Sequence, residues 1–148
     1  MSATRLLTLD SVTMRFGGLT AVDALELHVD SGEILGLIGP NGAGKTTVFN
    51  MVTGVNAPTE GQISFDGTVL NGLRPHKVTQ AGLARTFQNI RLFDNMSALD
   101  NVIVGTHARH HASVVGAVLG LPHFRAEEKQ GRERALELLE FVGVSDKS

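Results

Sequence analysis

Eight consecutive residues of this 148-residue chain have the types and spacing needed to bind phosphate. They run from Gly39 to Thr46 as Gly-Pro-Asn-Gly-Ala-Gly-Lys-Thr and match the pattern G-x-x-x-x-G-K-[ST] in full. Glycines let the backbone curl so that successive N–H groups point inward toward phosphate oxygens. Lys45 adds a positive charge that can reach the β- and γ-phosphates, and Thr46 offers a hydroxyl to Mg²⁺. The pattern therefore indicates a site for a nucleoside triphosphate, without specifying the reaction.

A buried strand and a helix are expected to hold this loop. Residues 34–38 (Ile-Leu-Gly-Leu-Ile) form a continuous apolar run, which is typical of a strand covered on both faces in a parallel sheet. A helix is expected from Lys45 to about Thr53, ended by Gly54. Its amino end would present unpaired N–H groups and the positive end of its dipole to the phosphate. A Gly-rich turn without a ligand is the competing interpretation, but such a turn needs neither the lysine nor the threonine.

Antiparallel strands are predicted around this unit. Residues 7–12 begin a strand, and residues 21–29 alternate apolar and polar side chains, as a half-buried strand does. A hairpin is predicted over residues 62–70, because its central Asp-Gly pair is a favoured two-residue turn. Residues 84–87 form a last strand-like segment. These patterns predict a mixed α/β fold with antiparallel hairpins near its start.

Helices are predicted after the hairpin. A short helix is expected over residues 76–83, and Ser97 with Asp100 resembles a capping box that begins a helix through about Val104. The last helix is expected to bury one apolar face, since its apolar residues fall at i, i+3, i+4 and i+7. These residues are Ala135, Leu138, Leu139 and Val142.

Composition excludes several classes of protein. The chain is 42% hydrophobic and 19% charged, which excludes intrinsic disorder, and it has no Cys for disulfides or thiol catalysis. A net charge of −2 does not indicate nucleic-acid binding. The amino-terminal residues do not resemble a secretory signal.

The longest weakly polar stretch, residues 112–122, is well short of the ~20 apolar residues that a membrane span needs. It is either a cover over the core or a contact for another subunit.

Two further clusters are interpreted without a ligand. His107, His110 and His111 fall on one helical face, but no Cys or carboxylate completes a metal site nearby. A solvated helix end is therefore favoured over a metal site. Residues 125–134 carry both signs of charge and predict a solvated helix face with i,i+4 pairs.

Three parts of the sequence together resemble the nucleotide-binding subunit of ABC transporters. They are Phe16, the loop from Gly39 to Thr47, and the string Thr86-Phe87-Gln88. In that family an aromatic side chain ahead of the loop, more often Tyr, stacks on adenine, and Phe16 stands at that position; a core aromatic is the alternative. Gln88 matches the family's glutamine that contacts Mg²⁺ and the attacking water and relays nucleotide state to the membrane subunits.

The resemblance implies a set of site residues. Gln88 is implied in catalysis, and Thr46 and Gln88 are implied as Mg²⁺ ligands. The implied nucleotide-binding residues are Phe16, Gly39, Pro40, Asn41, Gly42, Ala43, Gly44, Lys45, Thr46 and Thr47.

The same resemblance implies a fold and a function. The expected fold is an α/β P-loop ATPase core with an amino-terminal antiparallel β subdomain over residues 1–93, followed by the start of a helical subdomain over residues 94–148. The strings at 16–22 and 84–93 are similar to the ATPases of bacterial branched-chain amino-acid importers. The implied ligands are ATP and Mg²⁺, and the implied activity couples ATP binding and hydrolysis to amino-acid uptake.

Partners and location are implied in the same way. Such a subunit works with a second ABC ATPase subunit, identical or different, with integral membrane permease subunits and indirectly with a periplasmic or extracellular solute-binding protein. It lies at the cytoplasmic face of the cell membrane and does not bind nucleic acid.

The sequence departs from the family pattern in its second half. It contains neither an LSGGQ-type signature nor a Walker B strand that ends in Asp-Glu. Walker B supplies the Asp behind Mg²⁺ and the Glu that polarises water, so hydrolysis without it is expected to be very slow. We therefore expect a truncated ATPase domain that binds ATP without efficient hydrolysis. A non-catalytic nucleotide-binding fragment or a regulatory P-loop module is the alternative. A P-loop GTPase or kinase is a third hypothesis, although the N-K-x-D string that GTPases usually carry is not present.

Overall fold

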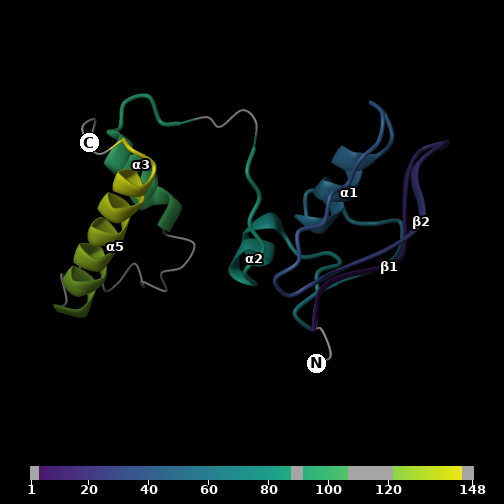
Figure 1. Ribbon diagram of the computed structural model, residues 1–148, viewed down its shortest axis with the longest axis horizontal. Helices are drawn as coiled ribbons and strands as arrows, with labels where there is room; N and C mark the ends of the chain where they lie inside the picture. Colours follow the sequence, from purple (N-terminus) through teal and green to yellow (C-terminus); the bar gives the residue numbers. More distant parts are fainter. Residues whose placement is uncertain (1–3, 88–91, 107–121, 145–148) are drawn as a thin grey trace. The chain divides into compact units, whose positions relative to one another are not determined.

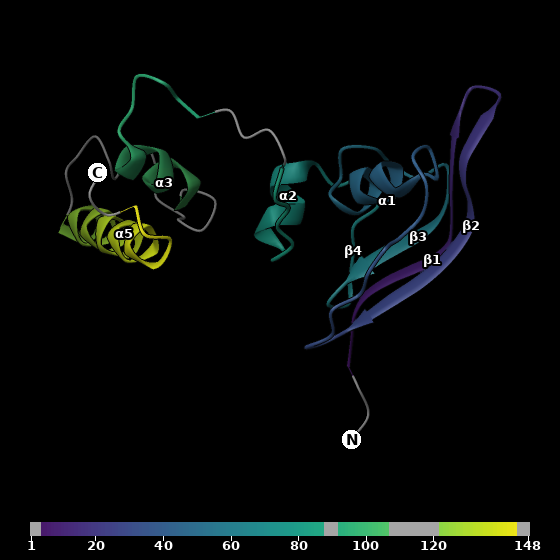
Figure 2. The ribbon, with the colours of Figure 1, turned by 45° about the horizontal axis from the view of Figure 1, so that its top comes forward.

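The computed structural model describes residues 4–87, 92–106 and 122–144. The chain divides into two compact units, Met1–Thr86 and Phe87–Ser148. Figures 1 and 2 together label the helices and strands, and the numbering follows them.

Unit 1 contains a four-stranded antiparallel sheet with the strand order β2-β1-β3-β4 (Figure 2). β1 (Arg5–Phe16) and β2 (Leu19–Asp30) are two long strands that pair along their length. β3 (Glu60–Phe65) pairs with the other edge of β1, and β4 (Thr68–Val69) pairs with β3. The predicted strands at 7–12 and 21–29 and the predicted hairpin at 62–70 are confirmed.

The hairpin between β3 and β4 turns at Asp66 and Gly67. Both residues have positive φ, 45° and 75°, which is the backbone required at the two central positions of a type I′ turn. The Asp-Gly pair therefore predicted this connection for the correct physical reason.

The sheet packs against α1 (Lys45–Val52). Val48, Met51 and Val52 are spaced i, i+3 and i+4, so they share one face of the helix, and that face is buried. The buried core of this unit consists of Leu9, Val12, Met14, Val48, Met51, Val52, Ile63, Leu70 and Val78. Val78 comes from the short helix α2 (Pro75–Gln80), which begins with Pro at a position where no backbone donor is needed. Both predicted helices are present.

Two predicted strands are not formed. Residues 33–40 have no regular secondary structure, and Ile34 and Ile38 are 98% and 92% exposed. A strand of a parallel sheet requires neighbouring strands to bond its backbone, whereas the sheet of the described residues is antiparallel and consists of β1 to β4. Residues 84–87 are likewise without regular structure. An apolar run predicts a buried strand, but burial requires neighbouring strands or helices to cover it. The prediction of a strand over residues 34–38 was therefore wrong for the described part of the chain.

Unit 2 contains α3 (Ala98–Thr106) and α5 (Pro122–Phe141). Ser97 precedes α3, and its Oγ accepts a hydrogen bond of 3.1 Å from the Asp100 N–H. The same hydroxyl donates to the Asp100 carboxylate over 2.8 Å. The first of these bonds satisfies a backbone donor that would otherwise lack a partner, and the second joins the two side chains. Together they confirm the predicted helix start.

The apolar face of α5 differs in part from the prediction. Ala135 and Leu139 are buried against Leu99 of α3, whereas Leu138 is 38% exposed and Val142 is 63% exposed. α3 is the element that covers α5 among the described residues, and one helix covers only a narrow stripe at i and i+4. Leu138 lies beside that stripe, and Val142 lies beyond the end of the helix.

The outer surface of α5 carries intrahelical ion pairs. Lys129 lies 3.8 Å from Glu133, and Arg134 donates to Glu137 over 2.6 Å. The predicted solvated charged face is confirmed for these residues. No helix within the described ranges combines the length and the apolar character needed to cross a membrane. The three histidines at 107, 110 and 111 and the stretch 112–121 lie outside the described residues.

Candidate phosphate-binding site

The loop before α1 depends on two glycines for its path. Gly42 and Gly44 have φ of 86° and 84°, a conformation that residues with a side chain rarely adopt. Gly44 is also pressed against the sheet: a Cβ placed there would lie 2.5 Å from the Ala21 carbonyl oxygen of β2 and 3.2 Å from Val22 Cγ2. Only glycine at this position lets the first turn of α1 approach β2 so closely, and this contact sets where the loop ends.

Lys45 closes the loop on itself. Its Nζ donates to the carbonyl oxygens of Gly39 and Pro40, both at 2.7 Å. An ammonium group has three N–H donors, so a third donor is left to bond an anion while these two bonds hold the start of the loop. Lys45 therefore both shapes the loop and carries its positive charge.

The amino end of α1 supplies backbone donors next to this charge. The first backbone bond of the helix runs from the Val48 N–H to the Gly44 carbonyl over 3.0 Å. The amides of Lys45, Thr46 and Thr47 precede it, and within the described residues no side chain caps this end. Three unpaired N–H groups, the positive end of the helix dipole and an ammonium group together form a site for a polyanion.

A magnesium nucleotide fits this set of donors. Thr46 is exposed in the first turn of α1, and its hydroxyl is a hard oxygen ligand of the kind Mg²⁺ accepts. Thr47 is half-buried beside it. Gln88, the second predicted Mg²⁺ ligand, lies outside the described residues. Among the residues that the structure describes, no group of three or more His, Cys, Asp or Glu side chains could hold a metal ion by itself.

Phe16 lies at the end of β1, where it pairs with Leu19 of β2. It is 47% exposed and does not belong to the buried core. Met14, two residues earlier, pairs with Val22, which is the residue that Gly44 approaches. Two residues of strand span about 7 Å, so Phe16 lies about 7 Å farther along β1 than Met14. A half-exposed ring at this place can offer one face to a base whose phosphates lie on α1.

Arg15, next to Phe16, is neutralised by an ion pair. Its guanidinium donates to the Glu60 carboxylate of β3. The hydrogen bond to Glu60, reinforced by the charge of that carboxylate, raises the pKa of Arg15. The cation beside the predicted base platform is therefore already paired, and Lys45 is the cation directed at the loop.

Sequence reasoning missed a contact at the other end of α1. Arg85 Nη1 donates to Asn50 Oδ1 over 2.8 Å, and the guanidinium carbon lies 5.9 Å from the centroid of the Phe49 ring. The two partners are 35 positions apart, and no pattern of fixed spacing in the sequence signals such a pair.

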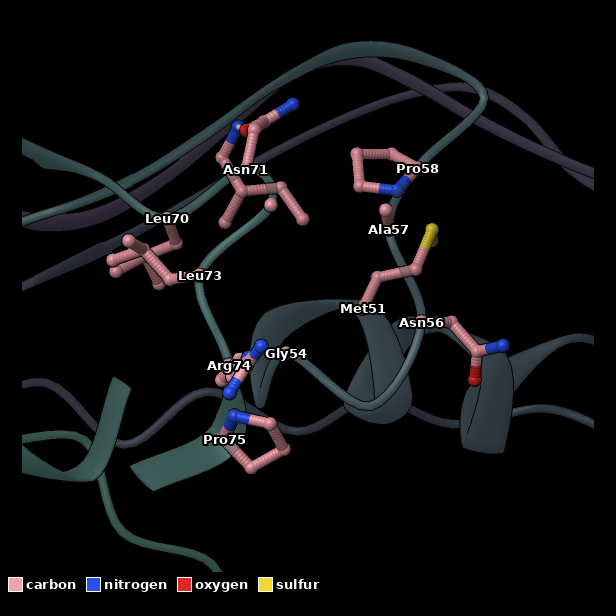
Figure 3. Close-up of a pocket in the computed structure, with 12 residues that line it drawn as sticks. Met51, Gly54, Asn56, Ala57, Pro58, Leu70, Asn71, Leu73, Arg74 and Pro75 are labelled. Atoms are coloured by element: carbon pink, nitrogen blue, oxygen red, sulfur yellow. Dashed lines mark hydrogen bonds between the residues drawn. The ribbon is translucent and has the colours of Figure 1, made fainter. Parts of the chain in front are cut away.

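A separate hollow of about 170 Å³ lies near the carboxyl end of α1 (Figure 3). Met51, Gly54, Leu70, Asn71 and Pro75 are among the residues that line it, and it shares none with the loop. Ligand pockets usually measure about 300–1,000 Å³. This hollow is therefore too small to be an alternative nucleotide site.

Comparisons with known proteins show the family to which the chain belongs. A family model described as ABC transporter matches residues 22–148. The chain is 43% identical over 141 residues to the high-affinity branched-chain amino acid transport ATP-binding protein BraF of Pseudomonas aeruginosa, covering 95% of this chain and 55% of BraF.

Solved structures of ATP-binding cassettes also match the chain. The ADP conformation of MJ1267, an ATP-binding cassette of an ABC transporter, matches with a TM-score of 0.76 and 27% identity, over 97% of this chain and 56% of that chain. A dimeric post-hydrolysis state of the ATP-binding cassette MJ0796, bound to ADP and Pi, matches with a TM-score of 0.67 and 26% identity, over 91% and 56%. The chain thus spans about half the length of the relatives it matches, and it belongs to the ABC transporter family.

Proposed function

We propose that this chain binds Mg-ATP as part of the ATP-binding subunit of an ABC importer. The observation that carries the proposal is the loop 39–47, in which Lys45 and the free amides of α1 converge at the point where Gly44 meets β2. The pattern of the sequence and the geometry of the loop independently indicate the same ligand class, a nucleoside triphosphate.

Each predicted residue has a role in this proposal. The amides of the first turn of α1 and the Lys45 ammonium bind phosphate oxygens. Phe16 stacks on the base, and Thr46 with Gln88 holds Mg²⁺. The bound Mg²⁺ neutralises charge on the phosphates. The nucleotide-binding core extends over residues 1–93, and a helical subdomain begins at residue 94.

The proposed transported solutes are amino acids of the branched-chain class. Support comes from the identity to BraF, whose name states high-affinity branched-chain amino acid transport. The proposed partners are a second ABC ATPase subunit, membrane permease subunits at the cytoplasmic face and, through them, a solute-binding protein. The dimeric structure of MJ0796 supports a paired arrangement.

A nucleotide-binding module without turnover is the second candidate. The observation that favours it is that these 148 residues include no LSGGQ-type string and no apolar strand that ends in Asp-Glu. Nucleotide binding is common to both candidates, so hydrolysis separates them.

The test of the proposal is titration calorimetry with Mg-ATP on the chain and two lysine variants. Lys45→Ala is expected to lose most of the affinity, because it removes the charge directed at the phosphates. Lys77→Ala is the matched control. It removes the same charge from an exposed position on α2, where the Lys77 ammonium donates to Gln80. Folding of both variants is checked by circular dichroism. Equal affinity of a folded Lys45→Ala variant and the control would overturn the site, as would the failure of the unmodified chain to bind ATP.

A further inference from the structure

The end of β1 is fastened to the start of β3 through side chains. The Arg15 guanidinium, one residue before the end of β1, forms a hydrogen-bonded ion pair with the Glu60 carboxylate. The Arg15 N–H donates to Thr59 Oγ1 over 3.0 Å. The Thr59 N–H donates to the Thr13 carbonyl over 2.8 Å, and the Thr59 hydroxyl donates to Met14 Sδ over 3.9 Å. Thr59 and Glu60 therefore hold three consecutive residues of β1.

These contacts lie where the pairing of the two strands ends. The ladder between β1 and β3 ends at the pair Thr13 and Glu60, two residues before Arg15. A backbone N–H beyond the end of a ladder needs another acceptor, and the Thr59 hydroxyl is that acceptor for Arg15. On this edge of β1, side chains thus continue the support that strand pairing gives to the earlier residues.

Phe16, whose ring is proposed to stack on the base, follows directly. On the other edge of β1 it pairs with Leu19 of β2. Gly17, with φ of 57°, and Gly18 come next, and glycine allows the chain a wide range of backbone conformations. The ring is half-exposed and lies outside the buried core. Its direction therefore depends on how firmly the end of β1 is held.

The ion pair and the ring belong to opposite faces of the strand. The register with β2 is regular from Arg15 to Phe16, and consecutive residues of a strand point to opposite faces of the sheet. The Arg15 guanidinium is also engaged by Glu60. Arg15 is therefore placed to orient the end of the strand and not to contact a ligand on the face of the Phe16 ring.

We propose that Arg15, Thr59 and Glu60 form a clip that positions the Phe16 ring for stacking on the base of the bound nucleotide. The three are positioning residues, because they act through the backbone of Phe16 and do not touch the nucleotide. The clip rests on the proposed function, since its effect requires a bound base. When the clip is opened, the ring adopts more orientations, and fewer of them offer its face to the base. The clip thus contributes to the affinity for the base and not to the affinity for the phosphates.

Two ligands that differ in the base test this distinction. Mg-ATP carries adenosine, whereas Mg-tripolyphosphate has three phosphates alone. Both are titrated by calorimetry into the unmodified chain and into Glu60→Gln and Thr59→Val, which each remove one contact and nearly keep the size of the side chain. Each variant is expected to weaken Mg-ATP about two- to fivefold, because exposed ion pairs and single hydrogen bonds stabilise one geometry by about this factor. Both variants are expected to bind Mg-tripolyphosphate normally.

Each variant has a matched control. Glu137→Gln breaks an exposed ion pair with Arg134 in unit 2. Thr79→Val removes an exposed hydroxyl from α2, where it donates to the Pro75 carbonyl over 3.1 Å. Thr59→Ser keeps the hydroxyl that accepts from Arg15. All three controls are expected to bind both ligands as the unmodified chain does.

A double-mutant cycle tests whether the clip acts through the ring. In a Phe16→Ala background, Glu60→Gln and Thr59→Val are expected to cause no further loss of Mg-ATP affinity, because the group that they position is gone. The same two- to fivefold loss in that background would overturn the proposal, since the contacts would then act by a route that bypasses Phe16. An equal loss for Mg-ATP and Mg-tripolyphosphate would also overturn it, because it would show a general effect on the structure of the site.

The remaining outcomes separate the clip from the proposed function. Circular dichroism checks folding, and if one variant does not fold, the other gives the decision. Normal Mg-ATP affinity in a folded variant would overturn the clip and leave the nucleotide site intact. Tighter Mg-ATP binding by Glu60→Gln would overturn the clip by showing that the released Arg15 contacts the nucleotide itself. If the unmodified chain bound Mg-tripolyphosphate as tightly as Mg-ATP, stacking and the clip would fail while the phosphate site stood. Failure to bind either ligand would overturn the proposed function and the clip together.

Discussion

Gly44→Ala and Gly42→Ala test whether contact with the sheet, in addition to backbone conformation, fixes the phosphate loop. The two glycines have nearly the same φ, 84° and 86°, but differ in their surroundings. A Cβ at Gly42 would meet nothing within 4 Å, whereas a Cβ at Gly44 would lie 2.5 Å from the Ala21 carbonyl oxygen. Gly42→Ala is therefore a control for conformation alone.

The expected losses of unfolding free energy follow from two effects, the left-handed backbone conformation at both glycines and the filled space around Gly44. An L residue in the left-handed region costs about 1–2 kcal/mol, and this cost applies to both variants. The lower entropy of the unfolded chain with alanine also affects both equally and cancels in the comparison. Forcing a Cβ into a filled space adds about 1–3 kcal/mol at Gly44 alone. We expect Gly42→Ala to lose about 1–2 kcal/mol and Gly44→Ala about 2–5 kcal/mol of unfolding free energy.

Urea unfolding followed by far-UV circular dichroism measures this difference, with equal m-values as the condition for comparing the two variants. Gly44→Ala is also expected to weaken Mg-ATP binding more than Gly42→Ala, because α1 must move away from β2 to accommodate the new methyl group. Equal losses of stability would refute the reasoning, since they would mean that the approach of Gly44 to Ala21 does not constrain the loop.

Three further outcomes are expected. Phe16→Ala should weaken Mg-ATP by about 1–3 kcal/mol in titration calorimetry, the range for base stacking on an aromatic ring, while Phe16→Tyr should bind almost normally. An alanine variant that is folded and binds normally would exclude stacking. In a phosphate-release assay the 148-residue chain should turn over far more slowly than the ~10 s⁻¹ of a typical enzyme. Steady turnover that Lys45→Ala abolishes would show that the catalytic residues lie within this sequence after all. Leu139→Ala should destabilise the packing of α3 on α5 by about 2–5 kcal/mol in thermal unfolding. Leu138→Ala, from the exposed side of the same helix, should change it by less than about 1 kcal/mol, and equal effects would contradict the assignment of the buried stripe.

Features made by neighbouring residues were predictable from the sequence. The turn at Asp66-Gly67, the cap formed by Ser97 and Asp100, and the start of α1 at Lys45 all arise within four residues of chain. Their chemistry is local, because a turn or cap is formed by the side chains and backbone donors of the same few residues. The prediction of a nucleoside triphosphate also rests on local chemistry, since one short loop contains most of the proposed phosphate donors.

Features that need a partner from elsewhere were decided by tertiary structure alone. The apolar run 34–38 has the composition of a buried strand, yet Ile34 and Ile38 are exposed and Leu37 is only partly buried, because the described residues place no strand beside the run. The contact of Gly44 with Ala21 and the hydrogen bond of Arg85 to Asn50 join positions that no spacing rule connects. The sequence by itself determined which residues could bind phosphate, while the packing of α1 on the sheet decided where that loop ends and which distant side chain holds the other end of its helix. The physical reason is that turns, caps and phosphate loops are formed by consecutive residues. The burial of side chains and the close approach of two segments depend instead on which surfaces the folded chain brings together.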